Sequence, residues 1–226
     1  SIGWRYLIPK ERYSASRIGS FVFHDSLLPN YRGFSPTVWA MRNGEVASGA
    51  SLFEMTENMD EGDIVDQRKV VIGPNDFIDK VVDDVTETYL RIIEDNYENL
   101  KNGEFTRTKQ NHNDATYTSK LLPEDFHINW FDTANNIFNL IRSYVYPYPY
   151  SFFYLNGQKI RVKSAIRITD RKYVGAIPGR VIGILKDKGV DVTTGNGIIR
   201  LVELIQENDS VHNAEKIINK LSHTLK

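Results

Sequence analysis

Apolar residues recur at steps of three and four over one long stretch of the chain. The stretch begins after Asn75-Asp76 and ends at Asn102-Gly103, which predicts an amphipathic helix with a C-terminal glycine cap. A second amphipathic helix is predicted over residues 131–145. A shorter helix is predicted over residues 37–43, because Ser35-Pro36 supplies an N-cap and a first-turn proline.

Short runs of β-forming residues predict the strands of an α/β domain. Residues 18–23 form an apolar run that reads as a buried strand ending at His24. Two further strands are predicted over residues 50–55 and 64–72, with the turn Asp60-Glu61-Gly62 between them. The first half of the chain therefore contains both strands and helices, as an α/β fold does.

The pattern changes after the segment Tyr146-Pro147-Tyr148-Pro149-Tyr150, because each proline disfavours helix in the residue before it. Beyond this point the apolar residues follow a period of two, with hairpin signals such as Asn156-Gly157. Five short strands are predicted, at 151–155, 159–168, 180–185, 190–194 and 198–205, followed by a terminal helix over 214–225. They suggest a small OB-like β-barrel, so we expect a catalytic core over 1–110, a linker with a helix over 111–149 and a barrel over 150–226.

The composition of this 226-residue chain limits the cellular compartments and the chemistry to be expected. It has no cysteine, which excludes disulfides and thiolate chemistry and fits a cytoplasmic protein. No apolar run approaches the roughly 18 residues of a membrane span, and the N-terminus lacks the order of a signal peptide. We therefore expect no membrane partner.

The net charge of −1 hides an asymmetry between the two halves. Residues 151–226 carry 13 Lys/Arg against 7 Asp/Glu, whereas residues 1–150 carry 15 against 22. A basic C-terminal portion could attract phosphate from RNA or from a nucleotide-linked substrate. A solvated, lysine-rich surface explains the same excess equally well.

His24 and Asp60 are the candidate catalytic residues. A histidine exchanges protons at physiological pH, and His24 leaves a strand beside a proline-stiffened apolar loop. Asp60 stands on a later glycine turn and could orient the imidazole. Each residue alone is typical of a structural position, so the hypothesis depends on their combination with the loop. The other histidines do not pair at metal-ligand spacing, and no metal site is expected.

The motif His24-x-Ser26-Leu27-Leu28-Pro29-x-Tyr31-Arg32-Gly33, followed by Asp60-x-Gly62, resembles the signature of formyltransferases that use N10-formyltetrahydrofolate. This family includes methionyl-tRNA formyltransferases and sugar N-formyltransferases. Similar segments occur at residues 4–8 and in Pro178-Gly179-Arg180-Val181, so the resemblance covers essentially the whole chain. It implies a Rossmann-like formyltransferase core, lacking its N-terminal part, followed by a small OB-like β-barrel.

The resemblance also implies roles for individual residues. His24 would take a proton from the attacking amine and return one to the leaving folate nitrogen, while Asp60 holds the imidazole. Two segments would bind the pterin through their backbones, and a third would line the folate site. The pterin segments are Tyr6, Leu7 and Ile8, and Thr56, Glu57, Asn58, Met59 and Asp60; the lining residues are Ser26, Leu27, Leu28 and Pro29.

The chain departs from the family pattern in two ways. The family has an asparagine two residues before the histidine, which donates a hydrogen bond to the developing oxyanion; this chain has Val22. Loss of one such donor costs about 10²–10³ in rate, so another group substitutes, or the enzyme is slow or specialised, or it is inactive. The family also carries further β-α-β units before the point at which this sequence begins.

The implied reaction is formyl transfer from N10-formyltetrahydrofolate to a primary amine. Trp39, Gln67 and the segment 4–8 resemble the enzymes whose acceptor is a nucleotide-linked amino sugar. Asp63 and the basic C-terminal portion instead suit initiator methionyl-tRNA, with phosphate contacts from Arg161, Lys163, Arg167, Arg171 and Lys172. A hypothesis of another class is a non-catalytic folate- or nucleotide-binding protein that keeps the fold. The sequence does not determine an oligomeric state.

Overall fold

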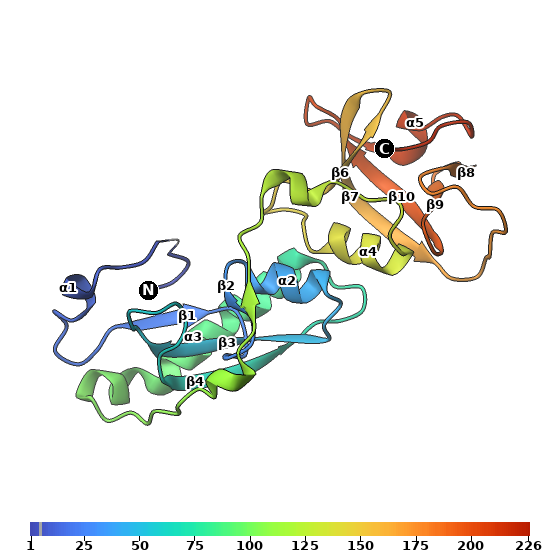
Figure 1. Ribbon diagram of the computed structural model, residues 1–226. Coiled ribbons are helices and arrows are strands. Elements are labelled where there is room, and N and C mark those ends of the chain that lie inside the picture. The colour runs from blue at the N-terminus through green and yellow to red at the C-terminus, as the bar shows by residue number, and fades with distance from the viewer. Residues whose placement is uncertain (5) are drawn as a thin grey trace. The chain divides into compact units, whose positions relative to one another are not determined.

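The computed structural model describes residues 1–4 and 6–226, which form two units (Figure 1). Unit 1 comprises Ser1–Ala40, Glu45–Asp76 and Lys80–Leu121, and unit 2 comprises Met41–Gly44, Phe77–Asp79 and Leu122–Lys226. Arg5, in the segment 4–8 that carries part of the family resemblance, lies outside the described residues. None of the helices in the described part of the chain is long and apolar enough to cross a membrane.

Unit 1 is built on an antiparallel sheet of three strands in the order β1-β3-β4. These are β1 (Phe21–His24), β3 (Ala47–Glu54) and β4 (Ile64–Val71). All three predicted strands are confirmed. In the register of this sheet His24 lies opposite Ser51, and Ser51 lies opposite Gln67.

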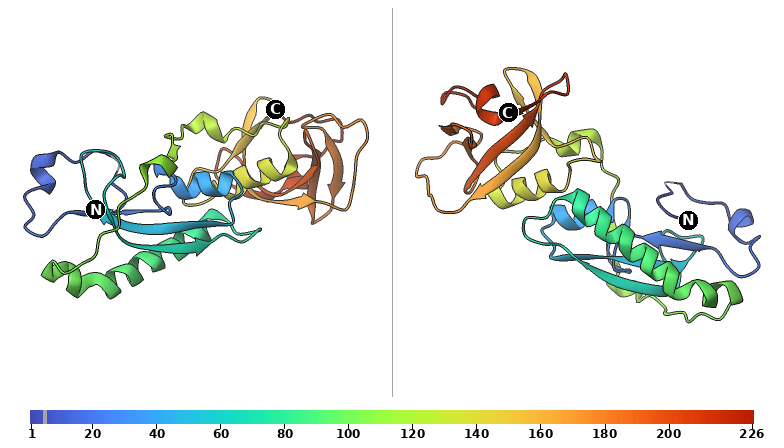
Figure 2. Two further views of the ribbon diagram at one scale, coloured as in Figure 1. Left: turned by 60° about the horizontal axis from the view of Figure 1, so that its bottom comes forward. Right: turned by 180° about the vertical axis from the view of Figure 1, so that it is seen from behind.

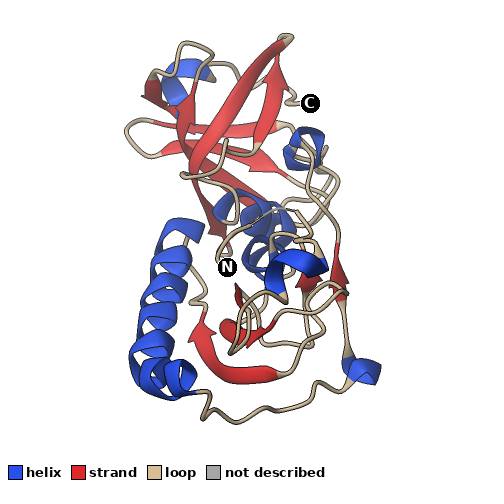
Figure 3. Ribbon diagram, turned by 90° about the vertical axis from the view of Figure 1, so that its left-hand side faces the viewer, coloured by secondary structure: helices blue, strands red, loops and turns tan. Residues whose placement is uncertain are grey.

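The long helix α3 (Ile78–Asn102) runs along one face of this sheet, as Figures 2 and 3 show, and confirms the predicted amphipathic helix. Its apolar stripe packs against side chains from all three strands. The resulting core contains Phe23, Ala50, Leu52, Val70, Val85, Tyr89 and Ile92. Because side chains alternate along a strand, the neighbours of Phe23 in β1, Val22 and His24, face away from α3.

The packing of α3 predicts a difference between two adjacent isoleucines. Ile92 is fully buried in the core under the sheet, whereas Ile93 is 37% exposed. Ile92→Val should therefore lower the free energy of unfolding by about 0.5–1.5 kcal/mol, because it leaves a methyl-sized gap in a close-packed core. Ile93→Val, the matched control, should change it by less than about 0.5 kcal/mol. Urea denaturation of both variants checks this; equal losses would contradict the packing described.

Shorter elements complete unit 1: α1 (Lys10–Tyr13), β2 (Arg32–Gly33), α2 (Pro36–Arg42), the 3₁₀ turn η1 (His112–Asp114) and β5 (Tyr117–Thr118). The helix α2 confirms the prediction and runs from unit 1 into the short segment assigned to unit 2. Strands β2 and β5 pair in parallel and were not predicted. Two-residue strands leave no periodicity in a sequence, because only their partner defines them.

Unit 2 contains η2 (Pro123–Phe126), helix α4 (Ala134–Arg142), capped by the hydroxyl of Thr133, and an antiparallel sheet against which α4 packs. The sheet order is β6-β7-β10-β9-β8, with β11 on β10. The helix and all five predicted strands are confirmed; only β11 is additional. The strands are β6 (Phe152–Leu155), β7 (Gln158–Ile168), β8 (Val181–Leu185), β9 (Gly189–Thr193), β10 (Ile198–Ile205) and β11 (Val211–Asn213).

The terminal helix predicted over 214–225 is wrong beyond its first turn, since α5 spans only Ala214–Ile217. The last residues are extended and hydrogen-bonded on both sides. Tyr154 in β6 exchanges two backbone hydrogen bonds with Lys226, and Leu225 donates one to the carbonyl of Gly179, just before β8. Leu225 is also 2% exposed, so burial and edge pairing together outweigh its helical pattern. Among the described strands the pairing remains an open path, and the OB-like barrel is not confirmed.

Candidate active site

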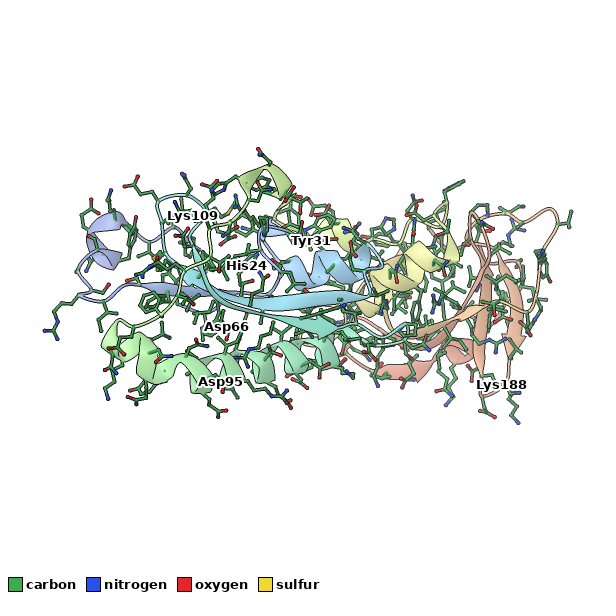
Figure 4. The ribbon with its side chains drawn as sticks, turned by 90° about the horizontal axis from the view of Figure 1, so that it is seen from below. His24, Tyr31, Asp66, Asp95, Lys109 and Lys188 are labelled. Carbon is green, nitrogen blue, oxygen red and sulfur yellow. The ribbon has the colours of Figure 1, made fainter. Side chains whose placement is uncertain are left out.

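His24 lies at the end of β1, on the face of the sheet away from α3; Figure 4 labels it near Tyr31. The residue is only 7% exposed. Its Nε2 lies 2.8 Å from the backbone carbonyl oxygen of Tyr31. A carbonyl oxygen can only accept, so this hydrogen bond requires the proton on Nε2; in the neutral ring the lone pair then lies on Nδ1.

Asp60 approaches the other nitrogen of the ring. Its Oδ2 lies 3.7 Å from Nδ1 of His24, and the two side chains are 14% and 8% exposed. The same oxygen accepts a 2.7 Å hydrogen bond from the backbone N–H of Gly33. Asp60 itself has a φ of 57°, a left-handed conformation, and its carboxylate points toward His24. The structure thus brings the two predicted catalytic residues together.

This arrangement defines what the pair can do chemically. A proton delivered to Nδ1 would create an imidazolium facing a carboxylate, in a place where little water screens the attraction. Neutral His24 can therefore accept a proton from a bound group and later release it. Such a pair is the minimum requirement for general base and general acid catalysis at one position.

Two polar residues on the same face of the sheet hold the loop Ser26–Pro29. Ser51 donates a 2.6 Å hydrogen bond to the carbonyl of Ser26 and accepts a 3.3 Å bond from the N–H of Leu28. Gln67 donates to the carbonyl of Leu28 at 2.9 Å and to the hydroxyl of Ser51 at 2.8 Å. The loop is therefore anchored at its backbone. Sequence reasoning missed Ser51, although the alternation along the strand places it beside His24 once the register is known.

The predicted folate segments lie in loops of unit 1. Tyr6 and Leu7 are 78% and 74% exposed, Ile8 is half-buried, and Met59 is 39% exposed. Lys10, just after the first segment, pairs with Glu57 of the second at 2.5 Å. The lining residues Ser26 and Leu28 are instead buried, at 2% and 3% exposed. Exposed apolar side chains therefore occur in both of the predicted pterin segments.

A cavity of about 420 Å³ lies in unit 1 between the N-terminal segment and the turn that follows β3. Thr56 is the one residue of the predicted folate segments among those that line it, and neither His24 nor Asp60 does so. Its remaining lining residues are Tyr13, Ser14, Ser16, Ile18, Gly19, Ser20, Glu54, Met55, Glu61, Gly62 and Asp63. The cavity thus adjoins the turn that carries Asp60, but neither His24 nor Asp60 lines it.

Val22 occupies the position at which the resemblance implies a hydrogen-bond donor. It lies opposite Phe53 in the sheet and two residues before His24, so both side chains project from one face of β1. An isopropyl group donates no hydrogen bond. Val22, the departure noted in the sequence, therefore lies on the same face of β1 as His24.

Tyr89 is a further residue that sequence reasoning missed. Its hydroxyl donates a hydrogen bond to a carboxylate oxygen of Asp25, the residue after His24. Burial, reinforced by the Asp25 charge, raises the pKa of the Tyr89 hydroxyl. The tyrosine stays protonated and so ties the end of β1 to α3. Its position in the helical stripe predicts burial but not this contact.

Two protein families match most of this chain. The family described as "Formyl transferase" matches residues 2–94, and "Formyl transferase, C-terminal domain" matches residues 120–222. The chain is 32% identical over 217 residues to the methionyl-tRNA formyltransferase of Mycoplasma mycoides subsp. mycoides SC, covering 95% of this chain and 68% of that one. The Fusobacterium nucleatum enzyme is 31% identical over 218 residues, covering 96% and 70%.

Solved structures share the fold at lower identity. HypX from Aquifex aeolicus in complex with tetrahydrofolic acid matches with a TM-score of 0.71 and 18% identity, over 96% of this chain and 37% of that one. WlaRD, a sugar 3N-formyltransferase, matches with a TM-score of 0.67 and 22% identity, over 88% and 70%. The chain thus spans about two thirds of its curated relatives, with both domains matched, and it belongs to the formyltransferase family.

Proposed function

We propose that this chain transfers a formyl group from N10-formyltetrahydrofolate to a primary amine. The observation that carries the proposal is the His24 imidazole, with its Nε2 at the carbonyl of Tyr31 and its Nδ1 facing Asp60. An amine attacks only through its free lone pair, so a base next to it must remove a proton. His24 is the buried group that can do so.

The proposed reaction forms one C–N bond and breaks another. The amine nitrogen attacks the formyl carbon, and Nδ1 of His24 accepts the proton that this nitrogen loses. Asp60 stabilises the imidazolium, while Tyr31 keeps the ring from turning. When the bond from the formyl carbon to N10 breaks, Nδ1 returns a proton to N10, so that His24 ends in its original state.

For the folate we propose the residues implied by the family resemblance. Backbone groups of Tyr6, Leu7 and Ile8 and of the segment 56–60 would hold the pterin, and Ser26–Pro29 would line the site. The exposed Tyr6, Leu7 and Met59 support the proposal, because a flat apolar ring would cover them. The ion pair between Lys10 and Glu57 ties the two pterin segments together.

Two acceptors are candidates. Methionyl-tRNA is supported by the 31% and 32% identical relatives, which are methionyl-tRNA formyltransferases. A nucleotide-linked amino sugar is favoured by the ion pairs on β7, where Arg161 pairs with Asp209 at 2.6 Å and Lys163 with Glu203 at 3.2 Å. Both cations were expected to meet RNA phosphate, yet each already faces a carboxylate.

One assay distinguishes the acceptors and the non-catalytic alternative. The consumption of N10-formyltetrahydrofolate is followed with methionyl-tRNA, and separately with a panel of nucleotide-linked amino sugars. Turnover with one acceptor supports the proposal and assigns the amine. Folate binding without turnover on either would instead support a binding protein, the reading that Val22 favours.

The tRNA alternative makes a quantitative prediction. If β7 contacts phosphate, the double variant Lys163→Ala/Arg167→Ala should weaken tRNA binding and reduce the slope of log K against log salt by about two units, since each lost contact removes about one. Lys101→Ala, on the exposed end of α3, is the control. Binding is measured by filter retention at several salt concentrations. An unchanged slope would show that β7 makes no contact with RNA phosphate.

For the architecture we propose a Rossmann-like core over 1–110, a linker over 111–149 and an OB-like barrel over 150–226. The C-terminal residues support the barrel, because Leu225 and Lys226 hydrogen-bond toward both edge strands, β6 and β8. A closed barrel would protect the amide N–H groups of Tyr154, Leu225 and Lys226 from hydrogen exchange as strongly as those of β9. Fast exchange at these three amides would argue for an open sheet.

A further inference from the structure

The buried Arg32, which follows the loop after His24, contacts the segment 108–118 of unit 1. Arg32 is fully buried, and its guanidinium donates to Oε1 of Gln110 at 3.2 and 2.7 Å. It also donates to the hydroxyl of Tyr117 at 3.1 Å and lies 3.4 Å from a carboxylate oxygen of Glu61. A charge without water needs such partners, so Arg32 fixes this segment in place.

Gln110 connects this segment to the turn that carries Asp60. Its amide nitrogen donates to the backbone carbonyls of Asp60 at 2.9 Å and of Gly62 at 2.7 Å. The residue is 6% exposed, and the two hydrogens of its amide are both engaged. Because Asp60 adopts a left-handed conformation in this turn, its carbonyl needs such a partner to stay there. Gln110 therefore holds the backbone that carries the carboxylate facing His24.

Thr116 acts on the other partner of His24. Its hydroxyl oxygen accepts a 2.8 Å hydrogen bond from the N–H of Tyr31, and its carbonyl accepts one of 2.9 Å from the N–H of Arg32. Tyr31 has a φ of 59°, and its carbonyl accepts from Nε2 of His24. The segment 108–118 thus contacts the backbones of both Asp60 and Tyr31, the two residues on either side of the His24 imidazole.

We propose that Gln110 and Thr116 are positioning residues, which hold Asp60 and Tyr31 at the two nitrogens of His24. This inference rests on the proposed function, since it assigns these residues to the same reaction. A catalytic group displaced by about 1 Å can cost about 100-fold in rate. The 3.7 Å between His24 and Asp60 leaves little tolerance for such a shift.

The variant Gln110→Glu tests whether Gln110 positions Asp60. A glutamate keeps the oxygen that accepts from Arg32, so the buried charge stays paired and the chain folds, but its second oxygen cannot donate to the carbonyls of Asp60 and Gly62. We expect kcat to fall about 100-fold, because the carboxylate that faces His24 is displaced. Asn113→Asp, which places the same charge on an exposed residue three positions away, is the control and should keep the wild-type kcat.

A double-mutant cycle separates positioning from general damage. In an Asp60→Asn background the substitution Gln110→Glu should cost little more, because the group that it misplaces is already disabled. Full additivity of the two losses, or a wild-type kcat in Gln110→Glu alone, would overturn the inference.

A spectroscopic readout makes the test independent of turnover. With ¹⁵N-labelled histidine, the ring nitrogens of His24 are assigned by comparison with His24→Ala. Their resonances should move in Gln110→Glu and in Thr116→Val but not in Asn113→Asp. If the wild type transfers no formyl group to any acceptor, the proposed function fails. The resonance shifts then test by themselves whether Gln110 and Thr116 position the His24 ring. Unmoved resonances in both variants would overturn the inference.

Discussion

Replacing His24 by alanine is expected to lower kcat/KM for formyl transfer by about 10²–10⁴-fold, the range that a positioned general base contributes. The loss follows from the proposed mechanism, in which Nδ1 of His24, facing Asp60 in the buried site, accepts the proton. Single-turnover measurement of formyl transfer to the active acceptor checks this. A variant that retained the wild-type rate would remove His24 from the mechanism.

The control must show that the fold survives. His24→Ala removes one hydrogen bond, to the carbonyl of Tyr31, which corresponds to about 1 kcal/mol of stability. The variant should therefore still unfold cooperatively, close to the wild-type midpoint. His212→Ala, in β11 of unit 2, deletes an imidazole that contacts only Ser210 among the hydrogen bonds found for its side chain, and should leave the rate unchanged. A similar loss in that variant would indicate general damage.

Replacing Gly62 by alanine should damage the site through the backbone. A Cβ at this position would lie 1.7 Å from the carbonyl oxygen of Glu54, far inside any tolerated contact. Gly62 also accepts a hydrogen bond from Gln110 and shares its turn with Asp60. We expect kcat to fall about 100-fold as the turn moves, and the free energy of unfolding to fall by about 1–3 kcal/mol.

The matched control for this change is Gly183→Ala in β8. There a Cβ would meet Asp191 at 3.5 Å, an ordinary van der Waals distance, so the substitution should be nearly neutral or slightly stabilising. Activity and thermal unfolding of the two variants are compared side by side. If Gly62→Ala kept both its activity and its stability, the tight turn beside Asp60 would not be needed.

The long elements followed from the sequence because their signals are local. The stripe of α3 and the alternation in β7 and β10 reflect burial on one face, which repeats along the chain. The terminal helix over 214–225 failed for the opposite reason. Its apolar residues fit a helical stripe, but the backbone of Leu225 pairs with Gly179, a partner 46 residues earlier.

The candidate site was accessible from the sequence only in part. A histidine at a strand end, an apolar loop and a glycine turn suggested His24 and Asp60, and the sheet brings these two residues together. The residues that hold the loop after His24 and the backbones of Asp60 and Tyr31 gave no signal. Ser51, Gln110 and Thr116 are ordinary polar residues in a sequence, and each acts through backbone groups that folding places beside it.

By itself, the sequence determined the family motif, the long helices and strands, and the candidate pair of a histidine and a carboxylate. These depend on residue type and on spacing within one element, which the chain carries in any conformation. The tertiary structure decided which nitrogen of His24 is free to accept a proton, because the carbonyl of Tyr31 occupies the other. It also decided that Gln110 hydrogen-bonds the turn that carries Asp60 and that Arg161 and Lys163 face carboxylates. Such contacts join residues far apart in sequence, and only the folded backbone specifies them.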